Sequence, residues 1–140
     1  MPRPAPAAAD PHRRTRDDHA QETAEDYVEA IAEVHAAEGR CRVIDLARLF
    51  DVSHVTVSKV VARLRREGLV EGEAYAPLTL TPRGRQLADE SRRRHEIVYN
   101  FLRAIGVSAR VAAIDTEGIE HHVSPQTLEC FRKLTAKMQG

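Results

Sequence analysis

The most constraining feature of the sequence is a stretch in its first half where two short helical patterns are separated by a tight turn. Residues 42–50 place apolar side chains at helical spacing. Ser53 is a favourable N-cap residue and opens a second helix that runs to Arg66, with Gly68 ending it. Two helices joined in this way, the second basic on its outer face, predict a helix-turn-helix.

A small β-hairpin is expected after the second helix. Two β-prone runs lie between Leu69 and Thr81, with a turn between them. A hairpin at this position is the wing of a winged helix, so the segment predicts binding to double-stranded DNA. The alternative is a winged helix that is used only for protein contacts.

The outer face of the recognition helix supplies the candidate DNA contacts. Val55 is expected to meet a thymine methyl group, whereas Thr56 and Lys59 are expected to reach base edges or phosphate. The arginines near the end of this helix are expected to contact the DNA backbone. The complete set of predicted DNA-contacting residues is Ser53, His54, Val55, Thr56, Lys59, Arg63 and Arg66.

The distribution of charge agrees with this interpretation. The formal net charge is zero, so no overall field favours nucleic acid. Residues 40–94 nevertheless carry 12 basic against 7 acidic side chains, whereas residues 1–39 carry 4 basic against 9 acidic. This asymmetry predicts a segment that binds polyanions beside one that collects cations.

Cysteine content and hydropathy indicate where the protein works. Two cysteines are too few for a disulfide framework, and neither a signal peptide nor an apolar run of transmembrane length is evident. We therefore expect a cytoplasmic protein without a membrane partner.

The other segments predict a mainly helical chain. Residues 1–20 hold four of the seven prolines and show no hydrophobic periodicity, which predicts a disordered tail. A first helix is expected over residues 22–38, a long helix from Pro82, capped by Thr81, to about Ile105, and two shorter helices after Ser108. Because so little chain follows the long helix, its apolar faces are expected to be completed by a second copy in a homodimer.

Acidic residues and a histidine crowd together near the C-terminus. Glu117, Glu120 and His121 stand at positions i, i+3 and i+4, so they share one face of a helix. Such groups repel each other or compete for protons unless a cation lies among them, and a divalent metal is such a cation. The alternative is a solvated acidic face that includes a histidine by chance.

Two other helices carry further candidate ligands. Asp26 and Glu29 are neighbours on the first helix, where acidic residues also complement the helix dipole, and His95 lies on a partly apolar face that would equally suit a core residue. If these residues converge with those near the C-terminus, four carboxylates and two imidazoles carry a charge of about −4, which two divalent cations would balance. Oxygen and imidazole donors without sulfur favour Mn²⁺ and tolerate Fe²⁺, Co²⁺, Cd²⁺ or Zn²⁺.

The chain resembles the manganese-transport regulators of the diphtheria-toxin-repressor family, which are metal-dependent winged-helix repressors. The resemblance covers roughly residues 23–138 and rests on residues 23–29, 53–69, 94–96 and 117–122, of which the last (EGIEHH) is the most specific. The metal ligands that it implies are Asp26, Glu29, His95, Glu117, Glu120 and His121. In the iron branch of the family, sulfur donors resemble the positions held here by Asp26 and Glu117, so their acidic identity implies manganese.

The function implied by this resemblance is that of a manganese-responsive transcriptional regulator, mainly a repressor. We expect it to bind operator DNA as a homodimer and to hold two Mn²⁺ ions per protomer. Metal-free ligands are expected to repel each other, and metal to fix the spacing of two recognition helices. Alternatives are an iron- or zinc-responsive regulator, a regulator that answers to an organic ligand, and a two-metal hydrolase. No substrate pocket or lid is indicated, so neither an enzyme nor a small organic substrate is expected.

The fold class expected from these patterns is mainly α with a small β-hairpin, in which a winged helix-turn-helix precedes a helical domain. The expected regions are a disordered tail at residues 1–20, a DNA-binding domain at residues 21–82, and a metal-binding and dimerisation domain at residues 83–140.

Overall fold

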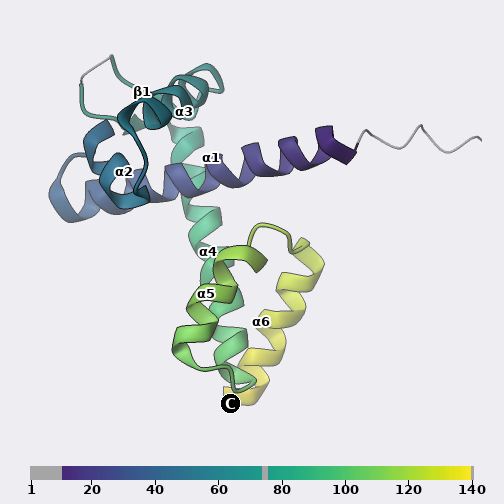
Figure 1. Cartoon of the computed structure of the whole chain (residues 1–140). Coiled ribbons are helices and arrows are strands. Elements are labelled where there is room, and N and C mark those ends of the chain that lie inside the picture. Colours follow the sequence, from purple (N-terminus) through teal and green to yellow (C-terminus); the bar gives the residue numbers. More distant parts are fainter. Residues whose placement is uncertain (1–10, 74–75, 140) are drawn as a thin grey trace, which may run out of the picture.

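The computed structural model describes residues 11–73 and 76–139, and this part of the chain contains six helices and one two-stranded hairpin (Figure 1). The predicted fold class is confirmed. The elements in chain order are α1 (Pro11–Glu38), α2 (Val43–Phe50), α3 (His54–Arg66), β1 (Val70–Glu71), β2 (Thr79–Leu80), α4 (Pro82–Ala104), α5 (Ala109–Ile119) and α6 (Pro125–Gln139).

Helix α1 is longer than the sequence predicts. It begins at Pro11, where the missing N–H of proline costs nothing because the first turn has no acceptor for it. Neither proline nor glycine interrupts the chain from there until Gly39, which has a φ of 80° and ends the helix. Residues 11–20, which the sequence analysis assigned to the tail, thus belong to α1 in the structure, and residues 1–10 lie outside the described residues.

The core of the winged helix forms where α1 passes beneath α2, α3 and the hairpin. Val28 and Ile31 of α1 are buried there, together with Leu46 of α2 and Leu64 of α3. The rings of Tyr27 and Phe50 stack with their centroids 4.7 Å apart, which joins α1 to α2 at one edge of this core. The apolar stripes that sequence periodicity predicts thus pack against each other.

The turn between α2 and α3 is fixed by local hydrogen bonds. Asp51 adopts the left-handed conformation with φ of 54°, and the N–H of Val52 donates to the carbonyl of Ala47. Ser53 Oγ then accepts from the backbone N–H of Thr56 at 3.1 Å, which is the predicted N-cap. These bonds confirm the helix-turn-helix.

The hairpin is short and is joined to the start of α4. Strands β1 and β2 are antiparallel, with Val70 opposite Leu80. Thr81, directly after β2, donates its hydroxyl to the carbonyl of Gly68 at 2.6 Å and accepts from the N–H of Gly84 at 3.0 Å. The predicted cap of α4 therefore also holds this helix against the end of α3.

Helix α4 links the winged helix to a second, smaller layer. It leads away from the winged helix, and α5 and α6 lie along its second half (Figure 1). Phe101 of α4 stacks on Phe131 of α6, with ring centroids 4.0 Å apart. Within the described residues, no helix combines the length and the apolar character that crossing a membrane requires.

We predict that Gly84→Ala destabilises the fold. A Cβ at this position would lie 2.0 Å from the carbonyl oxygen of Leu69, so the start of α4 would have to move away from the hairpin. We expect a loss of about 1–3 kcal/mol, as for other overpacking substitutions, in the free energy of unfolding measured with urea on the metal-free protein.

Gly118→Ala is the matched control, because the added Cβ meets nothing within 4 Å on α5. It should leave the free energy of unfolding unchanged or raise it by up to about 1 kcal/mol, since alanine favours a helix over glycine. Equal effects of the two substitutions would show that α4 is not closely packed at Gly84.

Candidate metal centre

Three helices bring acidic and imidazole groups together where α1 passes the middle of α4 and the C-terminal end of α5. Asp26 lies in the middle of α1, and Glu120 and His121 follow the last residue of α5 directly. Each of the three offers one ligand atom, and these atoms all lie within 4.8 Å of one another. The structure thus brings together residues from both ends of the chain.

The geometry around His121 suits a divalent cation. Its Nε2 lies 3.0 Å from Asp26 Oδ1 and 3.4 Å from Glu120 Oε1. Among the described residues this buried nitrogen has no aligned hydrogen-bond partner. An imidazole nitrogen left without a partner between two carboxylate oxygens is the donor set that a hard or borderline divalent ion takes. These residues therefore fit the metal that the sequence predicts.

His95 joins the cluster through Glu120. Its Nδ1 lies 2.9 Å from Glu120 Oε2, and the Glu120 side chain is only 2% exposed. One oxygen of Glu120 thus faces His95, while the other faces His121. Four of the six predicted ligands, Asp26, His95, Glu120 and His121, are connected in this way.

The other two predicted ligands lie at the margin of the cluster. Glu29 is half-buried and accepts a hydrogen bond from the Ser91 hydroxyl at 2.9 Å, whereas Glu117 is exposed on α5. The charges of both carboxylates raise the pKa of Glu120, so they lie near enough to influence it. The described structure does not bring either of them into the group of three.

Burial and neighbouring charges shift the pKa values of Glu120 and His121 in the cluster. Burial raises the pKa of Glu120 to about 7, although His95 and His121 act in the opposite direction. Burial alone would lower the pKa of His121, but the nearby carboxylates of Asp26, Glu25 and Glu120 outweigh it and raise this pKa to about 10. In the metal-free chain a proton on His121 therefore balances the carboxylates, and an arriving ion would take its place.

Glu25 is a member of this cluster that the sequence analysis missed. It is only 5% exposed. Its Oε2 accepts a hydrogen bond from His121 Nδ1 at 2.6 Å and lies 2.7 Å from Nη2 of Arg94, while Oε1 accepts from Gln21 at 3.1 Å. The sequence does contain a signal for this role. Glu25 lies three residues before Val28, inside the apolar stripe of α1, where an acidic residue needs a partner.

The outer face of α3 is the second candidate site. Val55 is 63% exposed, and Lys59 and Arg66 are also exposed. Ser53 and Thr56 lie there too, although their hydroxyl oxygens are 3.0 Å apart and engaged in the helix cap. This face is therefore open to a partner along most of its length.

Arg63 differs from the other residues of that predicted set. It is half-buried, and its Nη2 donates to the carbonyl of Ala20 at 2.9 Å. Its Nε lies 3.6 Å from Glu67 Oε1. The guanidinium thus ties α3 to α1 within the chain, which sequence reasoning did not anticipate.

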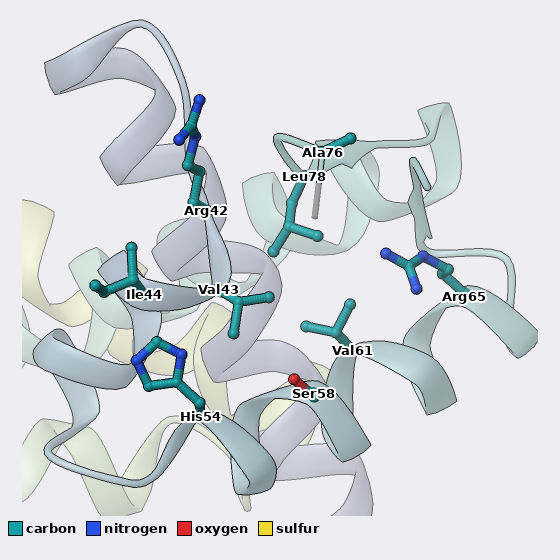
Figure 2. Close-up of a pocket in the computed structure, with 9 residues that line it drawn as sticks. All are labelled: Arg42, Val43, Ile44, His54, Ser58, Val61, Arg65, Ala76 and Leu78. Carbon is teal, nitrogen blue, oxygen red and sulfur yellow. The ribbon is translucent and has the colours of Figure 1, made fainter. Parts of the chain in front are cut away.

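A cavity of about 500 Å³ lies between the start of α2, α3 and the hairpin (Figure 2). The guanidinium of Arg65 points into it, and His54 and Ser58 border it from α3. Of the described residues that line it, none carries a carboxylate. Its lining combines the basic groups of Arg42 and Arg65 with aliphatic side chains from α2, α3 and the segment before β2.

Comparison with known proteins places both halves of the chain in one family. Residues 19–78 match the family model described as iron dependent repressor, N-terminal DNA binding domain. Residues 81–139 match the one described as iron dependent repressor, metal binding and dimerisation domain. The second of these matches ends on α6 and includes three of the candidate ligands that the structure connects.

The curated relatives are transcriptional regulators rather than enzymes. The transcriptional regulator MntR of Escherichia coli O157:H7 is 45% identical over 125 residues, which are 89% of this chain and 81% of that protein. The HTH-type transcriptional regulator MntR of Geobacillus kaustophilus is 41% identical over 115 residues, 82% of each chain.

Two solved structures share the fold. The manganese regulator SloR superposes with a TM-score of 0.70 at 29% identity, over 79% of this chain and 52% of that one. A manganese-dependent transcriptional repressor in complex with manganese gives 0.71 at 28% identity, over 81% of this chain and 52% of that one. The chain thus spans about half the length of these solved proteins.

The resemblance seen in the sequence is confirmed by these matches, which cover nearly all of α1 through α6. The chain belongs to the iron-dependent repressor family, whose members join an N-terminal DNA-binding domain to a metal-binding and dimerisation domain.

Proposed function

We propose that this protein is a manganese-responsive transcriptional regulator, mainly a repressor, that binds operator DNA as a homodimer. The observation that carries the proposal is the cluster in which Asp26, from the DNA-binding half, meets Glu120 and His121 at the end of α5. Relatives named as the regulator MntR, at up to 45% identity, support it.

The metal is proposed to be Mn²⁺, with two ions per protomer. The proposed ligands are Asp26, Glu29, His95, Glu117, Glu120 and His121. Manganese is favoured because carboxylates dominate this set and it includes no sulfur. Fe²⁺, Co²⁺, Cd²⁺ and Zn²⁺ are possible substitutes, and an iron- or zinc-responsive regulator is the second candidate because the matching family models are described as iron dependent repressors.

The proposed mechanism follows from the position of the cluster. Asp26 belongs to α1, which also carries the core of the winged helix, whereas Glu120 and His121 belong to the helical half. An ion bound by all three would fix the two halves relative to each other, and with them the recognition helix. Coupling of this kind is typically worth about 1–3 kcal/mol, enough to decide operator occupancy.

The homodimer is proposed to form through the helical half. Ile105, Val111 and Ile114 lie close together in sequence around the start of α5, and they are 51%, 45% and 64% exposed in the single chain. Exposed apolar side chains on one short stretch of chain suit a contact in which the same surface of two copies meets. The dimer would present two copies of α3 to two half-sites.

The proposed DNA contacts are those of the outer face of α3. They comprise Ser53, His54, Val55, Thr56, Lys59, Arg63 and Arg66. Arg63 would have to leave its bond to Ala20 to reach a phosphate. We further propose that the DNA-binding domain occupies residues 21–82 and the metal-binding and dimerisation domain residues 83–140, and that the protein works in the cytoplasm, where its DNA target lies.

We predict that the chelator-stripped protein binds an operator fragment tightly only after Mn²⁺ is added at micromolar levels. The fragment would come from the promoter of the protein's own gene or of a neighbouring transporter gene. Fluorescence anisotropy at fixed salt would measure binding in separate titrations with Mn²⁺, Fe²⁺ and Zn²⁺, because phosphate contacts make affinity depend on salt. Equal binding with and without metal would refute the metal switch, and a response to Fe²⁺ or Zn²⁺ alone would favour the second candidate.

Asp26→Ala should abolish most of this metal response, because it removes a carboxylate from the cluster. Asp18→Ala is the matched control, since it deletes the same side chain from an exposed position on the same helix. If the two variants respond to Mn²⁺ alike, Asp26 is not a ligand.

We predict that Lys59→Ala weakens operator binding and lowers the slope of log affinity against log salt by about one. The reason is that an exposed lysine on α3 displaces about one counterion from the DNA when it binds a phosphate. Arg93→Ala removes the same charge from an exposed position on α4 and should leave the slope unchanged. An unchanged slope in both variants would place Lys59 away from the DNA backbone.

A further inference from the structure

Glu25 links three helices through one carboxylate oxygen. Its Oε2 is 2.6 Å from Nδ1 of His121 and 2.7 Å from Nη2 of Arg94. The side chains of Glu25 and His121 are 6% and 2% exposed, and that of Arg94 is 24% exposed. We refer to Glu25, Arg94 and His121 together as the clasp, which joins α1 to α4 and to the end of α5.

The remaining contacts of Glu25 make it unsuitable as a metal ligand. Its other oxygen, Oε1, accepts from Gln21 at 3.1 Å. Both oxygens are thus occupied by donors from the protein, and the guanidinium of Arg94 balances the charge. A carboxylate whose oxygens already accept hydrogen bonds from the protein binds an ion less readily than exposed or unpaired carboxylates nearby.

The contact with Glu25 decides which side of the His121 ring is free. A carboxylate accepts but does not donate, so Nδ1 of His121 carries the hydrogen in this bond. That leaves Nε2 to face Asp26 Oδ1 at 3.0 Å and Glu120 Oε1 at 3.4 Å. Histidines that bind metals commonly donate their second ring nitrogen to a carboxylate, which fixes the ring and its tautomer.

The positions of these residues in the chain reinforce this role. Glu25 directly precedes Asp26, and Arg94 directly precedes His95. Glu25 and Arg94 therefore each share their local backbone with a proposed ligand on the same helix, and His121 is itself a proposed ligand, so holding the clasp together also holds the ligands near one another. Arg94 balances the charge of Glu25, so the carboxylate that holds His121 adds no uncompensated charge beside the ligands.

We propose that Glu25 is a positioning residue for the metal site: with Arg94 it forms a clasp that orients His121 toward the ion and assembles α1, α4 and α5 before the ion arrives. The inference rests on the proposed function, because it assigns a role toward the same metal. It adds residues that neither the ligand set nor the DNA-contacting set includes.

The first test is the affinity of the full chain for Mn²⁺, measured from the electron paramagnetic resonance signal of the free ion. Glu25→Ala should raise the dissociation constant about 10- to 100-fold with the number of bound ions unchanged, as is typical when a group that orients a ligand is removed. Glu25→Gln should lose less affinity, because its amide oxygen still accepts from Nδ1 of His121. Thermal unfolding, monitored by circular dichroism, would identify a temperature at which every variant is folded, and Mn²⁺ binding would be measured at that temperature.

Glu22→Ala is the matched control. Glu22 is also on α1, three residues earlier, and its carboxylate lies 3.6 Å from His122 rather than in the clasp. This substitution should change the dissociation constant for Mn²⁺ only slightly. Arg93→Ala and Arg94→Ala form a second pair on α4, in which only the loss of Arg94 should weaken Mn²⁺ binding.

Three outcomes would overturn the inference. An unchanged affinity in folded Glu25→Ala would show that the clasp is dispensable, and a loss of one bound ion would make Glu25 a ligand. Equal losses in Glu22→Ala and Glu25→Ala would reduce the effect to the net charge of α1.

A metal-free measurement separates the clasp from the proposed function. In the nitrogen–proton spectrum of the histidine rings, His121 of the wild-type protein should show a hydrogen-bonded Nδ1–H signal that Glu25→Ala removes and Glu25→Gln retains. If this signal behaves as expected but the wild type binds no Mn²⁺, the proposed function fails while the orientation of the ring stands. If the signal is absent from the wild type, the clasp itself is refuted.

Discussion

The arrangement of the whole molecule depends on charges of opposite sign meeting in a poorly solvated place. Glu25, Glu120 and His121 are each almost fully buried, and a buried charge without a partner is strongly destabilising. Arg94 and His121 supply the partners within the protein. Because Glu25 comes from α1 while its partners Arg94 and His121 come from α4 and the end of α5, its charge is compensated only when both halves of the chain are in contact. Under the proposed function, a divalent cation bound in this cluster would act on the same contact between the halves.

Helix α1 serves both halves. Val28 and Ile31 on one side pack into the core of the winged helix, while Glu25 and Asp26 meet α4 and the end of α5. A helix is stiff over a few turns, so a change in the position of Glu25 and Asp26 is passed to Val28 and Ile31 without a separate hinge. This explains why the boundary between domains, which falls near Pro82 in the sequence, is not a boundary between separate bodies in the structure.

Local signals made much of the fold predictable. The caps at Ser53 and Thr81 each depend on a residue three positions further along the chain, and both are present. Four candidate ligands are connected in the structure, although they come from α1, α4 and the end of α5. Helical spacing grouped Glu117 with Glu120 and His121, but Glu117 stays exposed on α5. Contacts between distant residues were less predictable. Glu25 and His121 are 96 positions apart, and no spacing rule relates them. The sequence also gave no sign that Arg63, which faces outward by periodicity alone, would bond to the carbonyl of Ala20.

That last contact bears on how a metal cluster acts on a DNA-binding surface. Arg63 lies on the recognition helix, and its partner Ala20 lies on α1 only five residues before Glu25, less than two helical turns away. The metal cluster and the recognition helix are therefore joined by a short rigid segment as well as by the apolar core. A shift of α1 relative to α5 would move Ala20 together with Asp26, and with them the anchor of Arg63. Under the proposed function, metal binding and the orientation of α3 would be coupled through the part of α1 that sequence periodicity alone assigns to a disordered tail and to the first turn of a helix.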